Sequence, residues 1–112
     1  MAKQCIQFVR QDAQAADAIR LEGVTSSGLA VNVKSIVLTA SEDATVQFLG
    51  GPDSAYDPTK PCSGTLALRK GVPLVLGPID DGHFVEHANS AFWMKCATVG
   101  AVIGGSMTYD IE

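Results

Sequence analysis

The stretch AFWMKCATVGAVIGGSMTYDI, residues 91–111, decides the fold of this chain. Side chains alternate between the two faces of a β-strand, so a strand with one buried face is apolar at every second position. The pattern predicts two such strands that meet at a tight turn near Gly100 and form the last hairpin of an all-β domain. Gly104 and Gly105 predict a bend or bulge in the second strand, and Trp93 falls on the outer face of the first. The expected inward side chains are Phe92, Met94, Cys96, Ile103, Met107, Tyr109 and Ile111.

The rest of the chain continues the same pattern of short strands. Residues 31–40 and 44–49 are predicted to form a second hairpin around the polar turn at 41–43. Pro73 lacks a backbone N–H, so we predict either that the strand around it lies at a sheet edge or that this backbone position faces outward. The remaining expected strands are 5–9 (a short strand or an extended arm), 18–24, 66–69, 72–76 and 83–86.

About eight short strands with turn signals every 8–12 residues are typical of an antiparallel sandwich or barrel. Eight strands in a chain of 112 residues favour a two-sheet jelly roll, although the strand order does not follow from the pattern. We expect an N-terminal arm or loop at 1–17 and a single β-sandwich domain at 18–112. A helix over 11–20 is the alternative to a loop there.

Composition and charge exclude several classes of function. Hydrophobic residues make up 46% of the chain, which predicts a packed core, and the net charge is -4 with scattered basic residues. A surface for nucleic acid is therefore not expected. The apolar runs are too short to span a membrane, and the first residues, MAKQCIQFVR, do not resemble a signal peptide. The expected compartment is cytoplasm-like.

Candidate chemistry is sparse. His83, Glu86 and His87 match the H-x-x-E-H pattern of zinc proteases, but that chemistry needs a helix and a third ligand, and an extended chain would hold the histidines about 13 Å apart. Asp80 and Asp81 with Glu86 could bind calcium, yet such turns are common in β proteins. Cys5, Cys62 and Cys96 fit neither a disulfide framework nor a zinc site; Cys96 is expected in the core and the other two as incidental thiols. We expect no catalytic residues, no metal and no cofactor.

Two further features are candidates for binding. The Pro-rich segment 50–64 is long for a connection inside a small domain, and such loops often carry contacts. Trp93 has three possible roles: stacking on a sugar, anchoring a protein interface, or lying buried beneath this loop within one subunit.

Several segments together resemble a small virion protein of tailed bacteriophages. They are KSIVLTAS at 34–41, ATVQF at 44–48, SGTLAL at 63–68, GVPLVL at 71–76, DGHF at 81–84, ANSAFWM at 88–94 and GGSMTY at 104–109. The resemblance covers roughly residues 30–110 and rests on pattern. The long 50–64 loop and the N-terminal arm depart from the commoner members.

The resemblance implies a jelly-roll decoration, or cement, protein on the outer surface of a virion capsid, assembled in the host cytoplasm. Its expected partners are the major capsid protein and copies of itself, as a dimer or trimer at symmetry axes, with no direct contact to nucleic acid or membrane. Such proteins are not enzymes. We expect the contacts in the arm and in the loop, and the interface candidates are Ile6, Phe8, Arg10, Tyr56 and Trp93.

A carbohydrate-binding β-sandwich module, or a tail or adhesin protein, is the alternative function. It rests on Trp93, Tyr56 and the Asp-rich turns, and it requires two or three coplanar exposed aromatic rings. The chain has only four Phe, two Tyr and one Trp, and most of them alternate inward.

Overall fold

The computed structural model describes residues 4–10, 18–23, 28–79, 81–97 and 101–112, with side-chain environments described from residue 20 onward. In these ranges the chain forms eight strands and no helix, so no helix long and apolar enough to cross a membrane is found there. The strands are β1 (Gln4–Arg10), β2 (Ala18–Glu22), β3 (Val31–Ala40), β4 (Ala44–Leu49), β5 (Leu66–Leu68), β6 (Leu74–Leu76), β7 (Phe92–Cys96) and β8 (Ile103–Ile111).

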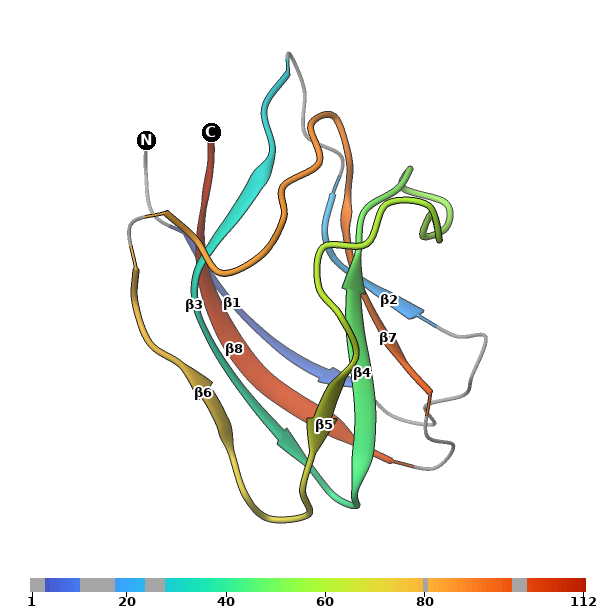
Figure 1. Cartoon of the computed structure of the whole chain (residues 1–112), viewed down its shortest axis with the longest axis vertical. Helices are drawn as coiled ribbons and strands as arrows, with labels where there is room; N and C mark the ends of the chain where they lie inside the picture. Colours follow the sequence, from blue (N-terminus) through green and yellow to red (C-terminus); the bar gives the residue numbers. More distant parts are fainter. Residues whose placement is uncertain (1–3, 11–17, 24–27, 80, 98–100) are drawn as a thin grey trace.

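The strands form two antiparallel sheets packed face to face (Figure 1). The strand order is β1-β8-β3-β6 in one sheet, called here the β8 sheet, and β2-β7-β4-β5 in the other, the β7 sheet. This is the jelly-roll order, in which successive strands mostly belong to opposite sheets. The prediction of an all-β, two-sheet jelly roll is confirmed.

Both predicted hairpins are wrong. β7 lies in one sheet and β8 in the other, and β3 and β4 are likewise divided between the sheets. Alternation reports which face of a strand is buried, but it does not report the neighbour to which the strand is hydrogen-bonded. The one consecutive pair that is hydrogen-bonded is β4 and β5, across the long loop.

The core lies between the sheets and follows the predicted faces. Phe48, Met94, Cys96, Ile103 and Tyr109 are at most 1% exposed. The Phe48 ring stacks on Phe92, with 5.2 Å between ring centroids, and contacts Phe84 at 4.9 Å. Tyr109 Oη donates a hydrogen bond to the Glu22 carboxylate and so joins β8 to β2 across the sandwich.

The prediction of a bulge at Gly104 and Gly105 is wrong. Both glycines pair in regular register with β3, and the irregularity of that pair lies between Val33 and Ser35. Gly105 instead allows close approach of two strands: it has φ +157°, and a Cβ there would lie 1.9 Å from the Val37 carbonyl oxygen.

Three other expectations meet the structure differently. Residues 83–86 form no strand and belong to the connection between β6 and β7. Residues 5–9, left open between strand and arm, lie within β1, which pairs with β8 along its whole length. The segment 11–17 and the turn at 98–100 lie outside the described residues.

Two local predictions are confirmed. β2 falls within the expected 18–24, and β6, which follows Pro73, is an edge strand.

Candidate protein interface

Trp93 is a buried residue, not an exposed anchor. Its side chain is 8% exposed and packs with Leu49 and Ala91 in a small cluster on the outer face of the β7 sheet. The indole Nε1 donates a hydrogen bond of 3.1 Å to the Pro52 carbonyl oxygen. Of the three possible roles, burial beneath the 50–64 loop is the one observed. The prediction that Trp93 is an interface residue is corrected, because the loop already covers it.

The loop that covers Trp93 is bound firmly to the sandwich. Gly50 N–H donates to the Lys60 carbonyl and Asp57 N–H donates to the Gly50 carbonyl, each at 2.8 Å, so the loop closes on itself. Ala91 N–H donates to the Gly51 carbonyl at 2.7 Å and ties the base of the loop to the start of β7. Gly51 has φ +140°, and a Cβ there would lie 2.6 Å from Asp57 N, so only glycine fits.

The tip of the loop faces solvent while its base is fixed. Residues 52–55 are exposed, and Asp53 pairs with Arg20 of β2 at 3.0 Å. Tyr56 is half-buried against the Trp93 cluster, and the Lys95 ammonium lies 5.2 Å from the centroid of its ring. Tyr56 therefore remains at the surface with one face covered. The loop presents a preformed protrusion rather than a flexible tether.

The three candidates in β1 lie in the other sheet. Ile6, Phe8 and Arg10 pair in register with Met107, Gly105 and Ile103 of β8, and their side chains lie outside the described residues. The five predicted interface residues are thus divided. Tyr56, in the loop, packs against Trp93 on the β7 sheet, whereas the other three belong to an edge of the β8 sheet.

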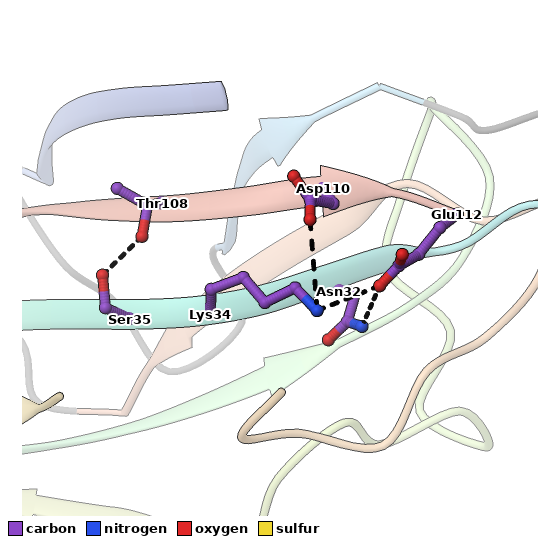
Figure 2. Close-up of polar contacts among 6 residues, drawn as sticks. All are labelled: Asn32, Lys34, Ser35, Thr108, Asp110 and Glu112. Atoms are coloured by element: carbon purple, nitrogen blue, oxygen red, sulfur yellow. Dashed lines mark hydrogen bonds and ion pairs between the residues drawn. The ribbon is translucent and has the colours of Figure 1, made fainter. Parts of the chain in front are cut away.

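A polar network covers one end of the outer face of the β8 sheet (Figure 2). The Lys34 ammonium lies 3.0 Å from a Glu112 carboxylate oxygen and 4.0 Å from Asp110. Asn32 Nδ2 donates to the same Glu112 oxygen at 2.5 Å. The alternation of β3 and β8 predicts such outward polar positions, but not which of them meet, because the strands are far apart in the sequence.

The pKa values of two carboxyl groups at this network are shifted in opposite directions. Hydrogen bonds from Lys34 and from Asn32 lower the pKa of Glu112. Burial, followed by the charge of Glu112, raises the pKa of Glu86, and Lys34 opposes the rise. Lys34 joins both carboxylates at the end of β8 to β3, whereas two buried oxygens of the network, Asn32 Oδ1 and Asp110 Oδ1, have no hydrogen-bond partner in the described part of the chain.

The residues of the zinc-protease pattern do not converge. His83 Nε2 lies 2.5 Å from the Gly77 carbonyl oxygen, and His87 Nε2 lies 2.9 Å from that of Pro61, so each ring contacts a different segment. Within the described ranges no group of three or more His, Cys, Asp or Glu side chains is placed to hold a metal. Asp80, of the suggested calcium site, lies outside those ranges, and Asp81 is exposed.

Two cysteines are buried as free thiols. Cys96 lies in the core as predicted, while Cys62 is also buried, at 5% exposed, and is not an incidental surface thiol. Burial raises the pKa of Cys62 to about 12. Cys5 belongs to the stretch without described side chains.

The edge of the sandwich at β6 carries an apolar surface that the sequence did not reveal. Four of the six exposed large hydrophobic residues in the described part of the chain lie within residues 72–85. The run VPLVL reads as continuously apolar, so alternation could not show which side chains face outward. Their exposed fractions are 58% for Val72, 59% for Val75, 45% for Ile79 and 61% for Val85.

Comparison with known proteins adds no identity: no protein-family model matches the chain, and the search of curated proteins found no match.

Proposed function

We propose that this chain is a non-catalytic structural protein of a tailed-bacteriophage virion. It binds the outer surface of the capsid lattice, through the major capsid protein, and stabilises the shell. The segments that resemble such proteins give the class, and the jelly roll is compatible with it. The proposal involves no cofactor, nucleic acid or membrane.

The observation that carries the proposal is the way in which the 50–64 loop is fixed to the sandwich. A binding surface that is ordered before contact loses little conformational entropy on association. The hydrogen bonds at Gly50, Gly51 and Pro52 hold the exposed tip on a rigid sandwich. Even weak contacts at such a tip give firm retention when many copies bind one lattice.

The first test is the number of copies per particle. Quantitative mass spectrometry of the virion, relative to the major shell subunit, is expected to give a ratio near one or a simple fraction of it. A few copies per particle would instead indicate a tail or adhesin role, and absence from the particle would refute the proposal.

The second test locates the contact. Ala55→Arg places a long cation at the exposed tip, and Ala67→Arg places the same side chain at an exposed position of β5. Cosedimentation with shells that lack the protein is expected to fall for Ala55→Arg and to stay near the wild-type level for Ala67→Arg. Equal binding of the two variants to the shells would exclude the loop tip as the contact with the capsid.

Sugar binding has lost its main support. The stacking role required an exposed Trp93, and that ring is covered by the loop. Phe48, Phe84 and Phe92 contact one another in the core. A glycan array with no signal is the expected result.

A further inference from the structure

A bulge in β3 places the side chain of Lys34 over the neighbouring strand. The pairing of β3 with β8 is regular except between Val33 and Ser35, and Lys34 is the extra residue at that point. A bulge re-aims the side chain of its extra residue, and bulges are frequent beside functional sites. The Lys34 ammonium reaches across the outer face of the sheet to Asp110 and Glu112, as Figure 2 shows. An amine from β3 and two carboxyl groups from the end of β8 are thus brought together.

Lys34 and Asp110 are the most sheltered pair in this group. Their side chains are 13% and 17% exposed, whereas that of Glu112 is 42% exposed. Lys34 Nζ lies 4.0 Å from Asp110 Oδ2, and Asp110 Oδ1 is buried with no hydrogen-bond partner in the described part of the chain. A sheltered ion pair is costly unless its remaining polar atoms are satisfied. Condensation of the pair to an amide removes both charges and one of the two carboxyl oxygens.

Glu86 adds a third carboxyl group, from the connection between β6 and β7. The charges of Lys34 and Glu112 both act on its pKa, so Glu86 lies near them. Burial is the largest cause of the rise in this pKa, and Glu86 therefore holds a proton more readily than an ordinary glutamate. A carboxyl group with a raised pKa is suited to carry protons between an amine and a departing oxygen.

We propose that Lys34 and Asp110 form an intramolecular isopeptide bond, an amide between Nζ and Cγ that joins β3 to β8 covalently. Lys34 first gives a proton to Glu112, whose carboxylate lies 3.0 Å away, and the neutral amine then attacks Cγ of Asp110. A C–N bond forms and a C–O bond breaks. The departing oxygen leaves as water with the two protons that the nitrogen has given up, and Glu112 and Glu86 relay these protons. The reaction needs no oxidant, reductant or other reactant.

The fold supplies what the same reaction lacks in free solution. Groups held in alignment within one molecule react with effective molarities that reach about 10⁵–10⁸ M. β3 pairs with the whole length of β8, so the folded sheet holds the two side chains together before they react. The amide keeps one N–H, which can still donate to Glu112. This inference is independent of the proposed function, because the bond forms within one chain and needs no capsid.

Mass spectrometry of the intact, purified full chain is the test. The mass is expected to be one water molecule lower than that calculated from the sequence. A proteolytic digest should contain a branched peptide that joins the segment around Lys34 to the segment around Asp110. Lys34→Arg and Asp110→Ala should each have the full calculated mass, whereas Lys70→Arg, at an exposed lysine, should still lack one water. The branched peptide of the wild type decides the matter if a variant does not fold.

Glu86→Gln tests the proton carrier. Circular dichroism is expected to show that this variant folds, while its cross-linked fraction should rise about a hundredfold more slowly than that of the wild type after synthesis. Glu42→Gln, at an exposed carboxyl group in the turn before β4, is the matched control and should react at the wild-type rate. A wild-type rate in Glu86→Gln would exclude Glu86 as the proton carrier.

Three results would overturn the bond itself. They are a wild-type chain with the full calculated mass, a loss of water that persists in Lys34→Arg, and a branched peptide that joins another pair of residues. The first result would show that the three groups form an ordinary ion-pair network. A chain without the bond that is abundant on virions would leave the decoration role standing, and a cross-linked chain that is absent from virions would refute that role alone.

Discussion

Replacing Trp93 tests whether this side chain is a buried structural residue or a surface anchor. Trp93→Ala removes a side chain that is 8% exposed and packs with Leu49, Ala91 and half-buried Tyr56. Truncating a buried Trp typically costs about 3–5 kcal/mol, as lost apolar transfer and as the cavity left behind. A domain of this size has a free energy of unfolding of about 5–15 kcal/mol, so a large share would be lost.

Trp93→Phe separates the hydrogen bond from most of the packing. A phenyl ring retains part of the contact with Leu49 but cannot donate to the Pro52 carbonyl. Losing a neutral hydrogen bond costs about 0.5–1.5 kcal/mol, and the smaller ring adds a cavity contribution. We therefore expect Trp93→Phe to fall between wild type and Trp93→Ala.

Urea unfolding followed by far-ultraviolet circular dichroism measures both variants. Trp93 is the only tryptophan, so its fluorescence in the wild type is also a single-site probe of the loop, and a blue-shifted native emission is expected. Val72→Ala, at a position 58% exposed, is the control and should stay within about 0.5 kcal/mol of wild type. Two Trp93 variants that unfold with the control would refute the burial of this side chain.

Three other substitutions or conditions test separate parts of the sandwich. Gly105→Ala should destabilise the fold by more than about 2 kcal/mol, because its Cβ would meet the Val37 carbonyl oxygen at 1.9 Å. In thermal unfolding each kcal/mol lowers the melting temperature of a domain of this size by about 4 °C, so a fall of less than about 2 °C would contradict this prediction. Cys62 should resist alkylation at pH 8 until urea unfolds the chain, since with a pKa of about 12 roughly one thiol in ten thousand is ionised; rapid labelling of native protein would show that it is accessible. Glu112 has a lowered pKa, so its contribution to stability is present above its ordinary pKa and is lost as the pH falls through the folded-state value; Glu112→Gln should flatten that acid limb, and an unchanged profile would exclude the contact with Lys34.

The sequence predicted burial well and pairing poorly. Phe92, Met94 and Cys96 face the core as their spacing indicates. Successive side chains of a strand point to opposite faces, so apolar residues at every second position identify the buried face. The same spacing made β7 and β8 look like a hairpin, although their partners are β2, β4, β1 and β3. The local pattern of a strand does not indicate which distant strand is its hydrogen-bonded neighbour.

The candidate site was predicted in part. The 50–64 loop was identified by its prolines and its length, but its function as a cover for Trp93 depends on the Pro52 carbonyl and on closure at Gly51, which are tertiary contacts. The edge at β6 was identified only through Pro73. Val75 is exposed because β6 is the last strand of its sheet, and the strand order cannot be predicted from any single strand.

The position of β8 has a consequence for synthesis. β1 is joined to its sheet only through β8, which also separates it from β3. Roughly 90 residues separate the end of β1 at Arg10 from the start of β8 at Ile103. At a translation rate of roughly 5–20 residues per second, the first strand waits roughly 5–20 s on the ribosome before its only sheet partner exists. The sheet that contains β1 can therefore be completed only after β8 has been synthesised, and the nascent chain passes through that interval with β1 and β3 unjoined.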